Sequence, residues 1–487
     1  MKRTFCILLA ALVLFSLPSC SFKEDEGETG EQARLLTSEE SKTMRLSYYS
    51  SDSLNPFTCK TKVNSRLMTL CYDGLYTLDT SLKPQPCIAE SSIVSGSRIN
   101  VSLSVCAFSD GTRITANDVV LSFENAKESD RFSTSLSNFD TCTASSQSVV
   151  IFTLTEPDPY ALSLLTFPII KSGSCADMAV GAGRYSFSRT DNGIFLNANI
   201  HSVGFEPNIK TIELTALRSE EQMVSNLEIG NTAVYFDDLS SGVYERKKAQ
   251  TVEVTLNSLV FLGMNCNNSI FSNESVRRAV NLSLDRSEIT TKAFQNHAVS
   301  CFTPFRPDWY EISSMDFTVK KNTAEAKLIL EESGVDITER SVTLLVNKEN
   351  PFKTEAASYI KESLEEVGFE VEVKEYTPEY FEEMLKLGGF DLYIGEISLL
   401  NNMSLDAFFE EGEIPGVDTE GESAVAYKKL RNSELSLMDF INTFNEDMPF
   451  TPLCCRTGVA SYANLIKASF NISSNDIFFD IENWVIS

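Results

Sequence analysis

Hydrophobic residues in the second half of the chain follow two alternating periods, one typical of strands and one typical of helices. Short apolar or alternating runs predict strands, and the longer runs between them, which end at Gly368 and Gly388, predict helices. Thr377 is expected to cap the second helix, with Pro378 at its first position. The predicted strands are 342–346, 369–373 and 390–394, and the predicted helices are 353–367 and 378–387. This order predicts a βαβαβ unit with parallel strands, which places a ligand beyond their carboxyl ends, in the segment that begins at Gly395.

Two further helices are predicted upstream, at 274–293 and 324–332. The second is expected to stop at Gly334. In the first, apolar residues recur at helical spacing at Val276, Ala279, Val280 and Leu284. We interpret both helices as core-facing.

An earlier stretch predicts a half-buried strand over 101–107, followed by a turn and a helix start. Asp110 with Gly111 is typical of a turn, and Thr115 with Asp118 has the spacing of a capping box. The alternative is that Asp110 and Asp118 are paired catalytic carboxylates, which would need a shared cleft and perturbed pKa values. The sequence indicates neither, so we interpret both aspartates as structural.

The N-terminus has the organisation of a secretory signal. Lys2 and Arg3 precede an apolar run over 5–17, which is too short to span a bilayer. The run ends at Leu17-Pro18-Ser19-Cys20, which resembles a bacterial lipobox and implies lipid attachment at Cys20. The alternative is an ordinary signal peptide with a chance cysteine. Residues 21–43 are acidic and polar, as expected of a flexible tether, so the folded part is expected to work outside the cytoplasm, anchored to the membrane through Cys20.

Composition narrows the possible partners. A chain of 487 residues that is 43% hydrophobic is long enough for two or three domains, and no later segment is apolar for long enough to cross a membrane. The net charge of −27 argues against nucleic acid as a partner, because binding the phosphate backbone requires a basic surface. The twelve cysteines form no CxxC pair, and their spacing leaves the redox state open.

Motifs for catalysis or metal binding are missing from the sequence. There is no HExxH, GxSxG or P-loop pattern, and the only histidines, His201 and His297, lack metal-ligand spacing. We therefore expect no enzyme activity, no cofactor and no metal site.

Several short groups occur in an order that resembles the extracellular solute-binding proteins of family 5, which are the oligopeptide, dipeptide and nickel-type receptors of ABC importers. They include Tyr72-Asp73-Gly74-Leu75, Phe108-Ser109-Asp110-Gly111-Thr112, Gly181-Ala182-Gly183-Arg184-Tyr185 and Phe390-Asp391-Leu392. The other groups lie at 82–84, 89–91, 115–123, 275–280, 284–286 and 325–328. The resemblance runs from about Leu54 to Tyr462, and the order and spacing of the groups make it specific.

The resemblance implies an α/β, two-lobe fold of the type II periplasmic-binding-protein class, with an accessory domain. Three discontinuous domains are expected: domain I from 44–76, 170–266 and 453–487, domain II from 77–169, and domain III from 267–452. Two chain crossings would form the hinge, and the lobes would close around the solute.

One departure from the family bears on the ligand. Oligopeptide receptors of this family carry a Trp and an Asp just after the Phe-Asp-Leu strand, and the Asp pairs with the peptide's α-ammonium group. Here residues 397–402 read Ile-Ser-Leu-Leu-Asn-Asn, which predicts a preference for N-blocked, long or apolar solutes. Glu396 is the alternative anchor, because a buried ammonium group needs a partner.

We expect 395–402 to face 55–57 and the strand 261–265 across a cleft. The ligand-binding residues predicted on this basis are Asn55, Phe57, Asn265, Gly395, Glu396, Ile397, Leu400 and Asn401.

The leading hypothesis is a monomeric, lipid-anchored receptor that captures a peptide or a small amphipathic solute for an ABC permease and its ATPases. The second is a receptor-like lipoprotein that signals or acts as a chaperone without feeding a transporter. The third is an extracytoplasmic hydrolase.

Overall fold

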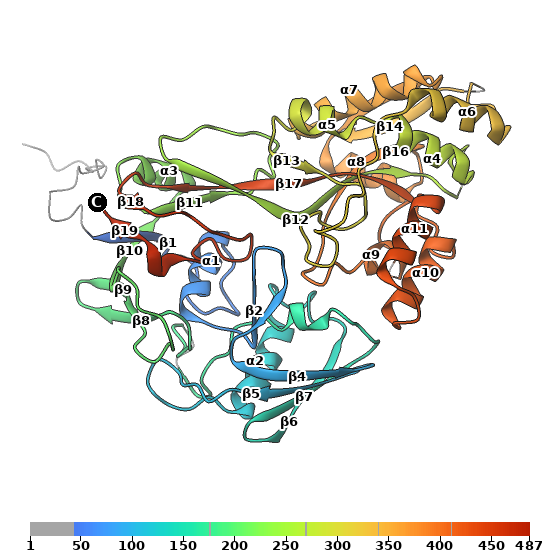
Figure 1. The fold of residues 1–487 in the computed structure, drawn as a ribbon. Helices are drawn as coiled ribbons and strands as arrows, with labels where there is room; N and C mark the ends of the chain where they lie inside the picture. Colours follow the sequence, from blue (N-terminus) through green and yellow to red (C-terminus); the bar gives the residue numbers. More distant parts are fainter. Residues whose placement is uncertain (1–42, 175–176, 268–269, 339, 411) are drawn as a thin grey trace, which may run out of the picture. The chain divides into compact units, whose positions relative to one another are not determined.

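The computed structural model describes residues 43–174, 177–267, 270–338, 340–410 and 412–487 (Figure 1). The predicted signal peptide, Cys20 and the tether as far as residue 42 lie outside the described residues. The described chain has the predicted mixed α/β fold, built on several separate sheets. Within it, no helix is both long and apolar enough to cross a bilayer.

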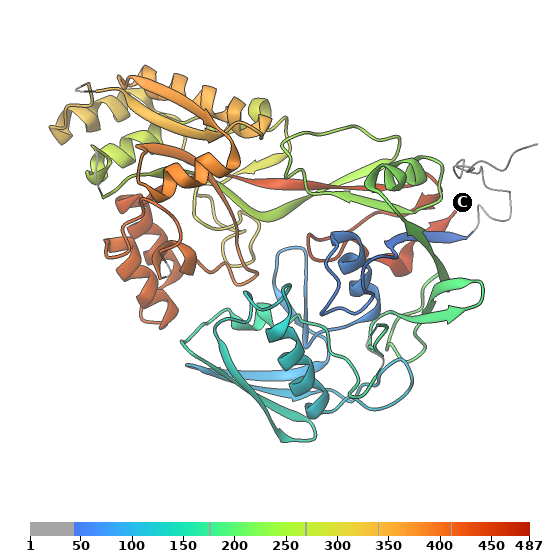
Figure 2. The ribbon, with the colours of Figure 1, turned by 180° about the vertical axis from the view of Figure 1, so that it is seen from behind.

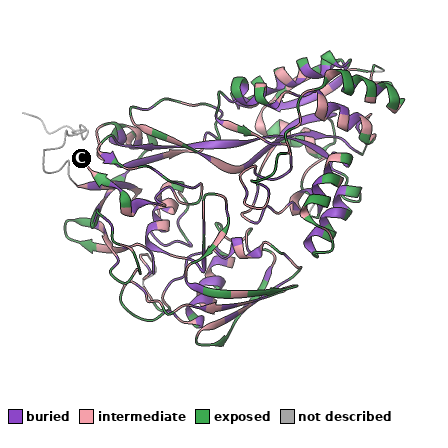
Figure 3. Ribbon diagram, in the orientation of Figure 1, coloured by how far each residue is buried: buried purple, intermediate pink, exposed green. Residues whose placement is uncertain are grey.

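The largest sheet has seven strands in the order β11-β17-β12-β16-β14-β15, with β13 paired to β17 (Figure 1). Its strands are β11 (Val234–Asp237), β12 (Gln250–Met264), β13 (Ala298–Ser300), β14 (Val342–Asn347), β15 (Val371–Tyr376), β16 (Leu392–Ser398) and β17 (Phe450–Tyr462). The antiparallel strands β12 and β17 are the longest, with 15 and 13 residues. β17 is buried along its whole length (Figure 3).

The predicted βαβαβ unit is confirmed. Strand β14 runs parallel to both β15 and β16, and the connecting helices are α7 (Pro351–Glu366) and α8 (Pro378–Lys386), which Figure 2 shows from behind. Asn350 caps α7 by accepting a hydrogen bond from the backbone N–H of Lys353 (3.1 Å). Gly368 follows α7 with a φ of +110°, a conformation that L side chains rarely adopt, so the helix ends there.

Four further helices belong to the core around the seven-stranded sheet: α4 (Glu274–Ser283), α6 (Thr323–Ser333), α10 (Glu422–Arg431) and α11 (Leu437–Asp447). The prediction of one helix over 274–293 was wrong. Asp285 interrupts it, because its side chain accepts from the backbone N–H of Glu288 (3.1 Å) and starts the short helix α5 (Arg286–Glu288). A π-helical turn at Ile289–Ala293 follows.

A separate four-stranded antiparallel sheet has the order β4-β5-β7-β6. Its strands are β4 (Ala89–Ser95), β5 (Arg98–Leu103), β6 (Phe139–Ser146) and β7 (Val149–Leu154). Helix α2 (Ala116–Glu128) packs on this sheet through Phe123, whose ring lies 5.6 Å from that of Phe152. All of these elements fall between residues 89 and 154, inside the segment predicted as domain II.

The strand predicted over 101–107 is shorter in the structure. β5 ends at Leu103, and Val105 is 84% exposed, because the backbone turns where Ile114 donates to the carbonyl of Cys106. The structural interpretation of the two aspartates is confirmed. Asp118 accepts from the backbone N–H of Thr115 (2.9 Å), and Gly111 has a φ of +82° in the turn that Asp110 begins.

A third sheet joins distant parts of the chain in the order β1-β10-β9-β8, with β1 parallel to β10. Its strands are β1 (Met44–Tyr49), β8 (Tyr185–Thr190), β9 (Gly193–Ala198) and β10 (Thr211–Leu217), and α1 (Lys62–Cys71) and α3 (Glu220–Glu228) lie next to it in the chain. The other strands and α-helix of the described residues are β2 (Tyr76–Leu78), β3 (Pro84–Pro86), α9 (Asp406–Phe409), β18 (Ile466–Lys467) and β19 (Val485–Ile486).

The apolar residues form two large cores. One surrounds the seven-stranded sheet and its helices, and the other joins the two four-stranded sheets to the C-terminal segment around Trp484. The exact domain boundaries given above stay a prediction.

Candidate functional site

A cavity of about 820 Å³ lies among the ends of several elements. This volume is within the range of small-molecule binding sites. Its walls come from the end of α1 and the following turn, and from segments near residues 104–107, 131–135, 164–168, 201–203, 399–401 and 475–479. The cavity is therefore built from residues that are more than 400 positions apart in the sequence.

Apolar side chains supply much of the cavity wall. They include Tyr72, Leu164, Phe132, Leu399 and Leu400. Val105 and Val203, which are 84% and 93% exposed, line the cavity as well. Apolar groups that open onto a cavity offer contacts to an apolar part of a ligand.

Three charged residues of the cavity wall interact with one another: Asp73, Asp476 and Arg184. Arg184 pairs with Asp476 (2.5 Å) and donates to the carbonyl oxygens of Phe478 (2.6 Å) and Thr69 (3.2 Å). Burial opposes the charge of Arg184, yet Asp476 and Asp73 together raise its pKa. The guanidinium group is therefore held mainly by Asp476 and by the backbone.

Asp73 differs from Asp476 because it makes no ion pair with any residue in the described part of the chain. The thiol of Cys87 lies against its carboxylate, and Cys87 and Cys106 both line the cavity. Burial raises the pKa of Asp73 to about 6, although Arg184 acts in the opposite direction.

A second charged group on the wall is Arg131, whose guanidinium carbon lies 4.9 Å from the centre of the Phe132 ring. No ion pair joins Arg131 to a carboxylate within the described residues. Behind it, Phe57 packs edge-on against Phe132, with 6.1 Å between the ring centres.

Two of the predicted ligand-binding residues, Leu400 and Asn401, line the cavity. The backbone N–H of Leu399 donates to the carbonyl of Asn257 (2.8 Å), and the Asn257 amide donates to Asn401 (3.0 Å). These contacts fix the 399–401 segment at the wall.

The structure places the other predicted residues elsewhere. Asn55 and Phe57 are buried in a turn, where the Asn55 side chain accepts from the backbone N–H of Phe57 (2.9 Å). Asn265 donates to the carbonyl of Phe390 (3.1 Å). Gly395, Glu396 and Ile397 lie within β16 and are absent from the cavity wall.

The expectation that 395–402 faces 261–265 across a cleft was wrong. β12 and β16 are neighbouring antiparallel strands of one sheet, with Phe261 opposite Gly395. A Cβ at Gly395 would lie 2.4 Å from the Phe261 ring, so the glycine is needed for packing. The two segments are therefore joined by backbone hydrogen bonds.

Glu396 is paired with cations of the chain itself. Its carboxylate lies 2.6 Å from Lys353 and 2.5 Å from Arg456, and it accepts from the Ser258 hydroxyl. Burial alone would raise the pKa of Glu396, but the two cations lower it to about 2.

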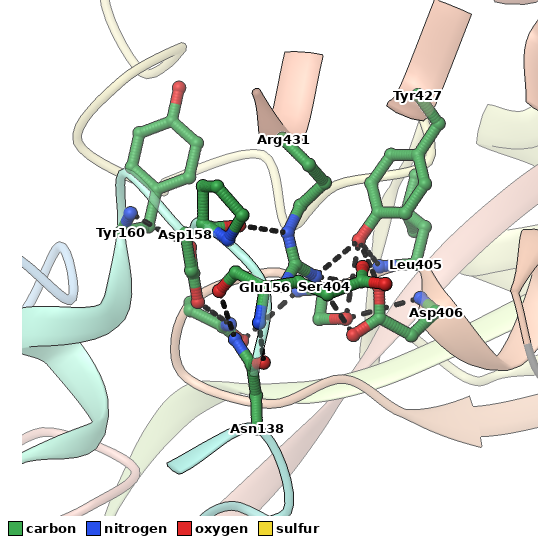
Figure 4. A network of polar contacts seen from close by, with 11 residues as sticks. Asn138, Glu156, Asp158, Tyr160, Ser404, Leu405, Asp406, Tyr427 and Arg431 are labelled. Carbon is green, nitrogen blue, oxygen red and sulfur yellow. Dashed lines mark hydrogen bonds and ion pairs between the residues drawn. The ribbon is translucent and has the colours of Figure 1, made fainter. Parts of the chain in front are cut away.

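A network of polar contacts joins residues 156–160, from the predicted domain II, to residues 402–431, from the predicted domain III (Figure 4). Asn402 donates to Asp158 (2.7 Å), and Arg431 donates to the carbonyl of Pro157 (3.2 Å). Arg431 also pairs with Asp406 (2.6 Å). Asp158 is 2% exposed, and burial raises its pKa against the effect of Arg431.

The sequence did not identify Asp73, Arg131, Arg184, Val105 or Val203 as site residues. A signal existed for two of them, because Asp73 and Arg184 lie in groups that carry the family resemblance. Arg131 and Val203 stand in segments without a distinctive pattern, and Val105 lies in the stretch that predicted a half-buried strand over 101–107.

A family model for bacterial extracellular solute-binding proteins, family 5 (middle region), matches residues 83–410. The chain belongs to this family. Its members are substrate-binding proteins rather than enzymes, and the family is extracellular. The resemblance stated from the sequence motifs is thus confirmed.

Among curated proteins, the oligopeptide-binding protein AppA of Bacillus subtilis (strain 168) is 22% identical over 213 residues. The match covers 40% of this chain and only 39% of that relative's length.

Solved structures of similar fold include MppA, a periplasmic murein tripeptide binding protein in its unliganded open form (TM-score 0.73, 15% identity, 91% of this chain and 98% of that one). HbpA2 from Haemophilus parasuis has a TM-score of 0.70 at 16% identity, covering 91% and 99% of the two chains. NikZ from Campylobacter jejuni in complex with Ni(L-His) has a TM-score of 0.60 at 16% identity, with the same coverage. At these identities the likeness establishes the fold, which is that of the family 5 solute-binding proteins.

Proposed function

We propose that this family 5 protein captures a peptide, or a related small amphipathic solute, in the 820 Å³ cavity and delivers it to an ABC permease with its ATPases. The observation that carries the proposal is the lining of this cavity, in which apolar side chains surround a few charged groups. The similarity to an oligopeptide-binding protein supports a peptide as the solute.

The cavity lining suits a solute with both apolar and charged parts. Leu399, Leu400 and Val203 offer contacts to apolar side chains. Arg131, which forms no ion pair with a carboxylate of the described residues, offers its guanidinium group to a carboxylate of the solute. A cavity of this size suits a short peptide better than a long one.

The first experiment is native mass spectrometry of the purified soluble domain, to detect a solute that remains bound. After removal of that solute by unfolding and refolding, calorimetric titration with the identified compound gives its affinity. Leu400→Arg should abolish binding, because it places a long charged side chain in the cavity wall. Leu387→Arg is the control, since Leu387 is 72% exposed and lies outside the cavity wall. Unchanged binding by Leu400→Arg would overturn the assignment of this cavity.

We also propose that the chain is anchored through a lipid at Cys20 and that it acts as a monomer. Each buried CH₂ of an acyl chain contributes about 0.8 kcal/mol to membrane attachment. Cys20→Ala is expected to shift the protein from the membrane fraction to the soluble fraction, without the mass increase of lipidation. Equal membrane retention of the variant would contradict the anchor.

The transport-independent lipoprotein and the extracytoplasmic hydrolase remain the alternatives. Neighbouring genes for a permease and an ATPase favour import, and their absence favours the signalling or chaperone role. Turnover of a peptide library by the purified protein would favour the hydrolase.

A further inference from the structure

The backbone holds Asp73 firmly at the cavity wall. Its carbonyl accepts from the backbone N–H of Ile169 (2.9 Å), and the next residue, Gly74, is pressed against another segment. A Cβ at Gly74 would lie 2.8 Å from the backbone carbonyl carbon of Thr166. The backbone at Asp73 is therefore fixed by contacts between residues 73–74, which follow α1, and the 166–169 segment, before any solute binds.

Of the two carboxylates near Arg184, only Asp476 forms an ion pair with it among the described residues (2.5 Å). Arg184 also donates hydrogen bonds to backbone carbonyl oxygens. This leaves Asp73 with Arg184 as a more distant cation and with the Cys87 thiol as its neighbour. A partly buried carboxylate without a close counter-ion carries a cost in free energy, and the raised pKa of Asp73 reflects that cost.

We infer that Asp73 receives the ammonium group of the solute, so that the transported compound carries a free amine. This inference rests on the proposed function and assigns one end of the solute within the same cavity. An ammonium group would give Asp73 the close counter-ion that the described residues lack, and charge-assisted hydrogen bonds of this kind are strong. In the oligopeptide receptors of this family, an Asp that follows the Phe-Asp-Leu group pairs with the ammonium group. Here that Asp is missing, and Asp73, from a different segment of the chain, would take its place.

The inference reverses the preference for N-blocked solutes predicted from residues 397–402. Leu399 and Leu400 remain part of the cavity wall, but they would contact an apolar side chain of the solute and leave the amine to Asp73.

The test uses a synthetic pool of tri- to pentapeptides and the same pool after N-acetylation. Each pool is dialysed against the solute-free soluble domain, and bound peptides are quantified by mass spectrometry. Lysine-containing peptides in the acetylated pool distinguish a side-chain amine from the α-ammonium group. Asp73→Asn keeps the shape of the side chain, and Asp316→Asn is a control with the same loss of charge at an exposed position.

Wild-type protein and Asp316→Asn should bind free peptides about 10- to 100-fold more tightly than acetylated ones, the range expected for a hydrogen bond to a charged group. Asp73→Asn should remove this discrimination while still binding acetylated peptides. Equal discrimination by wild type and Asp73→Asn would overturn the inference and leave the proposed function intact. Failure of wild type to bind any peptide would overturn the proposed function and this inference with it.

The pH dependence gives an independent readout. Because an ammonium group binds the ionised carboxylate, the affinity for free peptides should fall as the pH drops below about 6, the pKa of Asp73 in the solute-free protein. The other titratable or charged groups that line the cavity are Tyr72, Tyr76, Cys87, Cys106, Arg131, Arg184, His201 and Asp476. His201→Gln separates the contribution of the histidine. Persistence of the same pH dependence in Asp73→Asn would exclude Asp73 as its source and overturn the inference.

Discussion

At the scale of single residues, Asp73 is expected to destabilise the solute-free fold. Its pKa of about 6 lies above the value of about 3.9 for an aspartate in an unfolded chain, so between these values the folded state binds the proton more strongly. Stability contributed by this group is therefore full at low pH and is lost as the pH rises towards 6. Asp73→Asn should raise the Tm of the solute-free protein at pH 7.5, and should raise it less at pH 4.

Thermal unfolding at both pH values checks this prediction, with Asp316→Asn as the control for the loss of one negative charge. A Tm at pH 7.5 that is unchanged or lowered in Asp73→Asn would mean that the carboxylate already has an adequate counter-ion in the fold.

Glu396 should behave in the opposite way. Its pKa of about 2 is below the usual value for a glutamate of about 4.3, so it contributes stability at neutral pH that is lost as the pH falls from about 4 towards 2. Glu396→Gln would leave the buried Arg456 and the half-buried Lys353 without their shared carboxylate. Breaking a buried ion pair in this way typically costs about 3–5 kcal/mol.

Urea unfolding at pH 7 measures this loss, and Glu349→Gln, at an exposed position just after β14, is the matched control. Peptide binding by the folded fraction of Glu396→Gln should be preserved. If binding is abolished while stability is unchanged, Glu396 is the ammonium anchor and Asp73 is not.

At the scale of elements, the sequence predicted structure well where a local pattern decided it. The parallel strands β14, β15 and β16 and their helices follow from periodicity, and the capping box at Thr115 follows from two residues three positions apart. The helix predicted over 274–293 failed at Asp285, because a side-chain hydrogen bond to the backbone of Glu288 outweighed the apolar spacing.

The site was harder to predict than the elements, because its walls come together only in the folded chain. The rule that ligands lie beyond the ends of parallel strands led to Leu400 and Asn401, which line the cavity. It could not show that the opposite partners of β16 are residues of β12, since strand pairing across more than a hundred residues leaves no local pattern. Nor could it show that Asp476 forms the ion pair with Arg184, while Asp73 forms no ion pair with any residue that the structure describes.

At the scale of the whole molecule, the network around Asp158 and Arg431 joins segments that the family resemblance assigns to different domains (Figure 4). Contacts of this kind form only when the two segments are together, so they favour the closed form of a two-lobe receptor. Asp158 is absent from the cavity wall, which allows closure to be weakened without a change in the contacts to the solute.

Asp158→Ala should therefore weaken solute binding through the closure equilibrium. It removes the acceptor of the Asn402 amide, a hydrogen bond to a charged group that is typically worth about 1.5–3 kcal/mol, or roughly 10- to 100-fold in affinity. The loss should lie mainly in a faster dissociation rate, because the closed complex reopens more readily. Stopped-flow dissociation and calorimetry measure both quantities, and Asp140→Asn, exposed on β6 of the same predicted domain, controls for charge. A variant with wild-type affinity and an equally slow dissociation rate would show that this network holds the chain together without taking part in solute capture.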